Sequence, residues 1–258
     1  MKGLNGRTAV VTGAAAPRGI GRATALRLSE EGVRLVLNDV NAAELNAFVA
    51  ELRSRGGEAV AVAGDIAEAA TAGKLVDAAL ATYGRLDILV NNAGITESVS
   101  IFDLTEEQWD RMLGINLKSV YLCTRAALVP MKNQNYGRIV NVSSVAGRNG
   151  GGFGSSHYAA SKAGIIGFTR AVAREVGPHG ITVNAVAPAS IDTDILTGKP
   201  SKDGLTPEEV RTFRINRTPL KRLAPADEVA SAIVFLASDD ASFVTGAVLD
   251  VNGGVFMG

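Results

Sequence analysis

The chain has 258 residues, with 26 basic and 26 acidic side chains and 47% apolar residues. A fold of this size buries roughly 70% of the surface that its unfolded chain exposes, so the chain can form a large core. Glycine and proline occur near their ordinary frequencies, which excludes a disordered or collagen-like chain. Balanced charge without basic or acidic blocks argues against nucleic acid and against anionic membranes as the main partners.

Cysteine and histidine are scarce, which bounds the compartment and the metal chemistry. The single cysteine, Cys123, excludes an intrachain disulfide and favours a reducing compartment. The first seven residues hold no apolar core of a signal peptide, and no apolar run approaches the ~20 residues that span a bilayer. Two scattered histidines and one cysteine do not make a three-ligand zinc site. We therefore expect a cytoplasmic protein without a metal.

Short β-branched runs alternate with stretches of helical period along the chain. The runs cover Thr8–Thr12, Val33–Leu37, Ala59–Ala63, Leu86–Val90, Arg138–Val142, Ile181–Val186 and Val248–Val251. Apolar strands separated by helices favour a parallel sheet, so the pattern predicts a Rossmann-type doubly wound α/β fold with strand order 3-2-1-4-5-6-7 and helices on both faces. Capping boxes at Thr105 and Thr206 predict two helix starts. We expect a single domain over residues 1–258, with a substrate loop near residues 189–223.

A glycine-rich turn follows the first strand run and opens the first helix. Glycines there allow a tight turn and a close approach of the backbone to a pyrophosphate, which N–H groups at the helix start can bind. The succession of strand, turn and helix therefore predicts a dinucleotide site that includes Gly13, Arg18, Gly19, Ile20 and Gly21.

Two charged side chains bear on which dinucleotide binds. Asp39 closes the second strand run 18 residues after Gly21, near the spacing expected of the acid that binds the adenosine ribose. Its carboxylate would repel a 2′-phosphate, by about 4 kcal/mol for one unit pair at 4 Å near a protein surface, which favours NAD. Arg18 points the other way, because a basic side chain in the turn can pair with that phosphate. NADP therefore stays possible.

Tyr158 and Lys162 open a predicted helix and share one of its faces. A free phenol has a pKa near 10, and one ammonium group about 4 Å away supplies the ~4 kcal/mol that would move this pKa to about 7. The spacing therefore predicts a tyrosine acid–base with a lowered pKa. Ser144 ends a strand run just upstream, where its hydroxyl can donate to a substrate oxygen and stabilise developing charge.

Together these ordered motifs resemble the short-chain dehydrogenase/reductase family in its single-domain form, over residues 6–254. The resemblance implies that Tyr158 donates or accepts the proton and that Ser144 orients the substrate. It implies that Lys162 lowers the pKa of the tyrosine and holds the nicotinamide ribose, while Asn116 holds a water in the proton relay to the lysine. The glycine turn departs from the family pattern, with five residues between Gly13 and Gly19.

The resemblance also implies cofactor contacts after three further strand runs and a homotetramer or homodimer. Asp65 would contact the adenine, and two residues after Pro188 would clamp the carboxamide. The whole set is Asp65, Ile66, Asn92, Ala93, Gly94, Pro188, Ile191 and Thr193.

The activity expected from these residues is NAD(P)-dependent interconversion of a secondary alcohol and a ketone. An alternative is a 3-oxoacyl-thioester (acyl-carrier-protein) reductase using NADPH. A catalytically silent dinucleotide-binding module also stays open, since a fold alone does not fix function. The basic side chains that could attract a phosphopantetheine, unless they are simply solvated, are Lys199, Lys202, Arg211, Arg214 and Arg217. His157, next to Tyr158, is expected to be an exposed loop residue.

Overall fold

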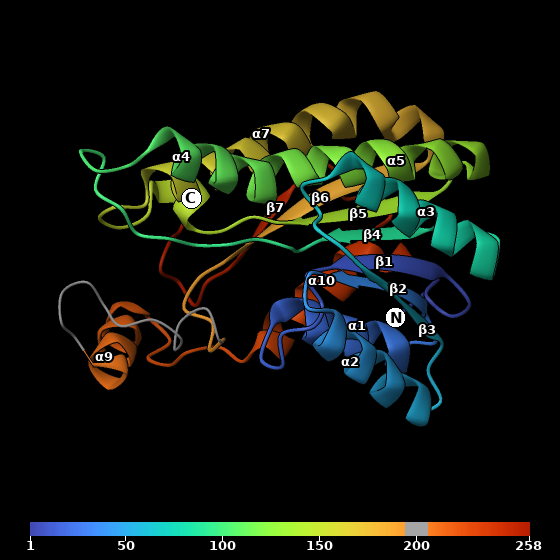
Figure 1. Cartoon of the computed structure of the whole chain (residues 1–258), viewed down its shortest axis with the longest axis horizontal. Helices are drawn as coiled ribbons and strands as arrows, with labels where there is room; N and C mark the ends of the chain where they lie inside the picture. The colour runs from blue at the N-terminus through green and yellow to red at the C-terminus, as the bar shows by residue number, and fades with distance from the viewer. Residues whose placement is uncertain (194–205) are drawn as a thin grey trace.

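The computed structural model describes residues 1–193 and 206–258, and it contains one seven-stranded sheet with helices on both faces (Figure 1). The strand order is β3-β2-β1-β4-β5-β6-β7, as predicted, and every neighbouring pair is parallel. The strands are β1 (Thr8–Thr12), β2 (Arg34–Asp39), β3 (Ala59–Ala63), β4 (Ile88–Asn91), β5 (Gly137–Val142), β6 (Ile181–Pro188) and β7 (Val248–Val251).

The helices form two layers, one on each face of the sheet (Figure 1). One layer is α1 (Ile20–Glu30), α2 (Ala42–Ser54) and α10 (Ala226–Ala237). The other is α3 (Ala69–Tyr83), α5 (Ser119–Gln134) and α7 (Ser156–Val176). The remaining helices are α4 (Glu106–Leu113), α6 (Ala146–Asn149) and α9 (Pro207–Arg217), with a π-helical segment over Gly114–Lys118 and 3₁₀ turns over Gly177–His179 and Asp239–Ala241.

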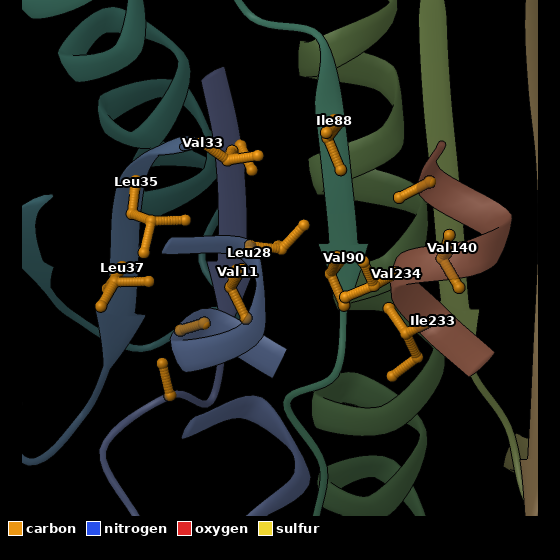
Figure 2. Close-up of a cluster of buried hydrophobic side chains, with 14 of the residues drawn as sticks. Val11, Leu28, Val33, Leu35, Leu37, Ile88, Val90, Val140, Ile233 and Val234 are labelled. Carbon is orange, nitrogen blue, oxygen red and sulfur yellow. The ribbon is translucent and has the colours of Figure 1, made fainter. Parts of the chain in front are cut away.

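Alternating side chains of the strands supply both cores. In β1, Val11 packs on the α1 and α10 side, whereas Val10 packs on the α3 and α5 side. Figure 2 shows the first of these cores, in which Leu28 of α1 and Ile233 of α10 meet side chains of four strands. Because both faces are buried, the strands read as continuous apolar runs in the sequence.

Both predicted capping boxes are present. The hydroxyl of Thr105 accepts a hydrogen bond from the N–H of Gln108 at 3.2 Å, and the side chain of Gln108 accepts one from the N–H of Thr105 at 3.1 Å. Thr206 and Glu209 make the same reciprocal pair at the start of α9, with Pro207 as its first residue. Reciprocal capping satisfies donors that a helix start otherwise leaves unpaired.

The carboxyl ends of β1, β4, β5 and β6 lie at one edge of the sheet, and α9 lies beyond that edge (Figure 1). Residues 189–193 and 206–223 of the predicted substrate loop belong to this region; the prediction for residues 194–205, with Lys199 and Lys202, lies outside the described residues. Within the described ranges, none of the helices is long and apolar enough to cross a membrane.

Candidate active site

The glycine turn after β1 is packed so closely that side chains would not fit. A Cβ added at Gly21 would lie 2.3 Å from the carbonyl oxygen of Gly13, and one at Gly13 would lie 2.8 Å from the Cα of Ala93. Gly13 also has a φ of +66°, in the left-handed region that favours glycine. The five residues between Gly13 and Gly19 end in a tight turn, in which the N–H of Gly19 donates to the carbonyl of Ala16 at 2.9 Å.

The segment after β4 holds this turn in place. The side-chain amide of Asn92 donates to the carbonyls of Thr12 and Gly13, at 2.9 Å each, and the N–H of Ala93 donates to the hydroxyl of Thr12 at 3.1 Å. Since the Asn92 amide donates to two main-chain carbonyls, this side chain fixes the position of the glycine turn.

The start of α1 and the end of β2 carry the groups expected of a dinucleotide site. Helix α1 begins at Ile20, its cap residue Gly19 supplies no side-chain acceptor, and its first turn contains no acid. Its N–H groups and the positive end of its dipole therefore suit a phosphate. At the end of β2, the carboxylate of Asp39 accepts hydrogen bonds from the N–H groups of Ala15 at 2.9 Å and Asn41 at 3.1 Å. These residues fit a nicotinamide dinucleotide.

Arg18, in the glycine turn, has a charged partner. Its guanidinium forms an ion pair with Asp192, which also binds Arg211 at 3.0 Å. The side chain that the sequence offers for a 2′-phosphate is thus engaged with a carboxylate from the segment after β6.

The predicted contacts after β3 divide between surface and core. Asp65 is exposed, and its carboxylate accepts a hydrogen bond from the N–H of Ala67 at 2.9 Å. Ile66 is only 4% exposed and packs in the core beneath α3, so its side chain serves packing. Gly94, after β4, is exposed; a Cβ there would lie 3.2 Å from Oδ1 of Asn116 and 3.4 Å from Nζ of Lys162.

The segment after β6 is tied to both neighbouring parts of the site. The carbonyl of Pro188 accepts a hydrogen bond from the N–H of Val145 at 3.0 Å. Ile191 is buried and forms an isolated parallel bridge with Ala224, and Thr193 is buried beside it. Burial and the bridge to Ala224 therefore fix the positions of Ile191 and Thr193, the residues proposed to clamp a carboxamide.

Tyr158 and Ser144 come together at the carboxyl end of β5. Tyr158 lies in the first turn of α7, and the side chain of Ser144 acts on its phenol as a neighbouring hydrogen-bonding group that lowers the pKa. The adjacent Ser143 is turned away, since its hydroxyl donates to the carbonyl of Lys162 at 2.8 Å. The structure therefore gives Ser144, rather than Ser143, the position beside the phenol.

Lys162 and Asn116 are both buried, and both side chains approach Gly94. Nζ of Lys162 donates to the carbonyl of Val142 at 2.9 Å and lies 5.9 Å from the centre of the Tyr158 ring. Asn116, fully buried in the π-helical segment, binds both the N–H (2.8 Å) and the carbonyl (3.0 Å) of Ile95. The asparagine side chain thus ties the segment after β4 to the site, and its hydrogens are also shared with Met112 and Ser161.

The electrostatics of Tyr158 differ from the sequence prediction. Burial raises the pKa of the phenol, opposed by the hydrogen bond to Ser144 and by the charge of Arg214. Lys162 is not among the causes of this shift, and burial lowers the pKa of its own ammonium group to about 8. The predicted lowering of the phenol pKa by Lys162 is therefore not found here, because Nζ is bound to Val142 and the ring is desolvated.

His157 corrects a second prediction. It was expected to be an exposed loop residue, but it is fully buried in the first turn of α7, and neither of its ring nitrogens has a hydrogen-bond partner. The reason is helical spacing, because His157, Ser161 and Ile165 recur every four residues along the buried stripe of α7. Burial lowers the pKa of the imidazole, while Glu97 raises it.

Two contributors to the site were not singled out as site residues from the sequence. Ser161 accepts from Asn116 at 3.1 Å and donates to the carbonyl of Tyr158 at 2.7 Å. Asp192 binds two arginines from different segments. The position of Ser161 in the tyrosine–lysine helix was the available signal, whereas nothing in the sequence distinguishes Asp192 from a solvated acid.

Comparisons with known proteins cover almost the whole chain. A family model described as "Enoyl-(Acyl carrier protein) reductase" matches residues 13–256. A 3-oxoacyl-[acyl-carrier-protein] reductase of Synechocystis is 42% identical, with both chains covered completely. The (2S)-[(R)-hydroxy(phenyl)methyl]succinyl-CoA dehydrogenase subunit BbsD of Thauera aromatica is 41% identical, over 98% of this chain and 97% of the relative. The uncharacterized short-chain type dehydrogenase/reductase y4mP of Sinorhizobium fredii is also 41% identical, over 98% and 99%.

Proposed function

The chain belongs to the short-chain dehydrogenase/reductase family of oxidoreductases, and on that premise we propose that it interconverts a secondary alcohol and a ketone. The observation that carries the proposal is the grouping of Ser144, Tyr158 and Lys162 at the carboxyl end of β5, which in the sheet order is separated by β4 alone from β1, the strand that the glycine turn follows. The bound nicotinamide supplies or accepts the hydride, as in other enzymes of nicotinamide chemistry.

In this proposal Tyr158 moves the proton at the reacting oxygen. Its raised pKa keeps the phenol protonated at neutral pH, the state that can protonate the oxygen of a ketone during reduction. Ser144 donates a hydrogen bond to the same oxygen and stabilises the negative charge that develops there. In the direction of alcohol oxidation the phenol must first lose its proton, which the charge of Arg214 and the side chain of Ser144 would favour.

We propose that Lys162 and Asn116 support Tyr158 and Ser144, Lys162 by holding the nicotinamide ribose and Asn116 by positioning the segment after β4. The ammonium of Lys162, with a pKa of about 8, still carries its charge at pH 7 and can hold the nicotinamide ribose. The side chain of Asn116 is committed to Ile95, Met112 and Ser161. It therefore positions the segment after β4, and a relay water held by this residue would bind its main chain.

We propose NAD as the preferred cofactor. The carboxylate of Asp39 is fixed at the end of β2 by two main-chain N–H groups, and a fixed negative charge there disfavours a 2′-phosphate. The pairing of Arg18 with Asp192 supports the same preference. Replacement of Asp39 (Asp39→Asn) should lower the ratio of kcat/KM with NAD to that with NADP at least tenfold; an unchanged ratio would remove Asp39 from cofactor selection.

A second candidate is the reduction of a 3-oxoacyl thioester with NADPH. The activity for which the Synechocystis relative is named favours it, since this relative is 42% identical along its whole length. The two candidates share the reaction at the carbonyl and differ in the remainder of the substrate and in the cofactor.

We further propose a homotetramer in the cytoplasm. The sheet edge at β7 exposes Leu249, and Phe243 nearby in the sequence is completely exposed, as expected of surfaces covered by another copy. Sedimentation equilibrium tests this assembly, because a tetramer has four times the 26.7 kDa mass of the chain and a monomer would overturn it.

The experiment that tests the function is a panel of ketones and secondary alcohols assayed with each nicotinamide dinucleotide. Turnover is followed by the near-ultraviolet absorbance of the reduced cofactor. The panel includes acetoacetyl-CoA as a 3-oxoacyl thioester, polyols and steroids. Turnover of any carbonyl or alcohol supports the proposal, and turnover of the thioester alone with NADPH supports the second candidate. Cofactor binding without turnover across the panel would favour a silent dinucleotide-binding protein.

A further inference from the structure

Helix α9 brings one cation toward the reacting pair without a partner of its own. Arg214 is half-buried, and in the described ranges 1–193 and 206–258 its guanidinium forms neither an ion pair nor a side-chain hydrogen bond. Its charge nevertheless acts on the phenol of Tyr158, whose pKa it lowers. A partly desolvated charge without a counter-ion carries a free-energy cost that ordinary surface arginines avoid.

The carboxylates near Arg214 are committed elsewhere or exposed. Arg214 lines a cavity of about 280 Å³ together with Arg18, Asp192, Glu208, Arg211 and Leu223, among others. Asp192 is shared between Arg18 and Arg211. Glu208 lies exposed in the first turn of α9 and makes no described ion pair with Arg214. Among the described residues, the cavity wall therefore holds three guanidinium groups against two carboxylates, and Arg214 is the arginine without an ion pair.

Hydrogen bonds fix the position of Arg214 relative to the site. Its carbonyl accepts hydrogen bonds from the N–H of Thr218 at 3.1 Å and from the hydroxyl of Thr218 at 2.8 Å. That hydroxyl lies 3.0 Å from the hydroxyl of Ser190, two residues after the end of β6. The end of α9 is thus bound to the same segment that carries Ile191, so Arg214 has a defined place beside the active site.

We propose that Arg214 binds a carboxylate of the substrate, and that the reacting ketone or alcohol is an oxo acid or a hydroxy acid. A guanidinium offers two parallel N–H groups that match a carboxylate, and such charge-assisted pairs both hold and orient a ligand. Arg214 lines the same cavity as Arg18 of the glycine turn and Asp192 after β6, so a carboxylate bound to it would lie at the carboxyl end of the sheet, beside the proposed cofactor site. The proposal rests on the proposed function, since it concerns the substrate of the same site.

The test compares straight-chain oxo acids of four to eight carbons with their methyl esters, which lack only the negative charge. Wild-type protein should prefer each acid to its ester. Arg214→Gln should lower kcat/KM for the acids on the order of 10- to 100-fold, mainly through KM, and leave the esters nearly unchanged. Arg214→Lys should retain part of the preference, because it keeps the charge but not the bidentate geometry.

Arg217→Gln is the matched control. Arg217 lies three residues further along the same helix, is exposed, and stacks on Phe213, so its loss should leave acids and esters alike unaffected. An equal loss for acids and esters in Arg214→Gln, accompanied by a shifted pH profile, would overturn the proposal and limit Arg214 to an effect on the pKa of Tyr158. A raised KM for acetoacetyl-CoA in both Arg214→Gln and Arg217→Gln would instead assign the basic helix to the phosphates of a thioester carrier and would also overturn it.

Calorimetric titration of the acids into protein saturated with NAD separates this inference from the proposed function. Binding that wild-type protein shows and Arg214→Gln loses supports the carboxylate site even where turnover is absent, in which case only the proposed reaction fails. Turnover of neutral ketones without any binding or preference for acids would overturn the carboxylate site and leave the reaction standing.

Discussion

The ammonium group of Lys162 donates a 2.9 Å hydrogen bond to the carbonyl of Val142, the last residue of β5. This contact points the cation at the sheet, and its distance from the centre of the Tyr158 ring is 5.9 Å. The lysine is 4% exposed, and burial lowers its pKa to about 8. The charge of Lys162 is therefore present at pH 7 and disappears above pH 8, within the range in which many oxidoreductases are assayed.

This pKa predicts how stability depends on pH. The folded protein binds fewer protons than the unfolded chain between pH 8 and the ordinary lysine value of 10.5, so the free energy of unfolding should rise with pH across that window. The gain is at most about 3 kcal/mol. Urea unfolding at pH 7 to 10 should show this rise in wild-type protein and not in Lys162→Met. The exposed Lys74, replaced in the same way, serves as control, and an equal rise in Lys162→Met would contradict the prediction.

Removal of the phenol hydroxyl tests the role of Tyr158. Tyr158→Phe should reduce turnover by about 10²- to 10⁴-fold, the usual contribution of general acid–base catalysis, because the proposal assigns the proton transfer to the phenol hydroxyl. Binding of the dinucleotide, measured by calorimetry, should change little. Tyr121→Phe, on the exposed side of α5, provides the control for loss of a phenol. Wild-type turnover in Tyr158→Phe would end the assignment.

The fold followed from the sequence because its signals are local and consistent. Apolar runs, helical stretches and the capping boxes at Thr105 and Thr206 specify where elements begin, and parallel pairing then leaves few arrangements. The boundaries moved by one or two residues at four strands; β6, for example, continues to Pro188. Such shifts arise because a strand ends where its neighbours stop pairing, which a single sequence does not display.

The sequence was sufficient to choose the candidate site residues, but it was not sufficient to predict their pKa values. The side chain of Ser144 acts on the phenol of Tyr158, and Asn116 and Lys162 both approach Gly94, so the residues that the motifs and the resemblance single out lie in one region of the fold. The direction of the Tyr158 pKa was wrong, because desolvation and the acceptor chosen by Lys162 depend on segments distant in sequence. The ion pair between Arg18 and Asp192, which are 174 residues apart, likewise depends on the tertiary structure.

The buried imidazole of His157 should make the protein sensitive to acid. Its pKa is lowered, so below pH 6.5 the unfolded chain takes up a proton that the folded protein resists, and the free energy of unfolding should fall as the pH falls. The slope is at most about 1.4 kcal/mol per pH unit for one group. His157→Leu should flatten this slope and add about 1–3 kcal/mol at pH 7, because two unpaired buried nitrogens are removed.

Urea unfolding between pH 5 and 7 measures this effect, with His179→Gln as the comparison because His179 is the other histidine of the chain. A slope in His157→Leu as steep as in wild-type protein would show that the acid sensitivity arises elsewhere. A loss of stability at pH 7 would show that the imidazole makes a favourable contact, such as one through water.

Two glycine-to-alanine substitutions distinguish the effect of crowding the glycine turn from the effect of alanine on helix stability. In Gly21→Ala the new Cβ would meet the carbonyl of Gly13 at 2.3 Å and the Asn92 amide at 2.5 Å, so the turn must open. Overpacking of this kind costs about 1–3 kcal/mol, and an opened turn no longer presents its N–H groups to a pyrophosphate. Gly21→Ala should therefore melt at a lower temperature and bind NAD weakly or not at all.

Gly73→Ala is the matched change in an open position, since nothing lies within 4 Å of its added Cβ in α3. There alanine should raise the free energy of unfolding by about 0.5–1 kcal/mol, because it loses less backbone freedom in a helix than glycine. Calorimetric titration with NAD and thermal melts of both variants make the comparison. Undiminished NAD binding in Gly21→Ala would mean that the dinucleotide does not rely on this turn, and the site would have to be sought away from the end of β1.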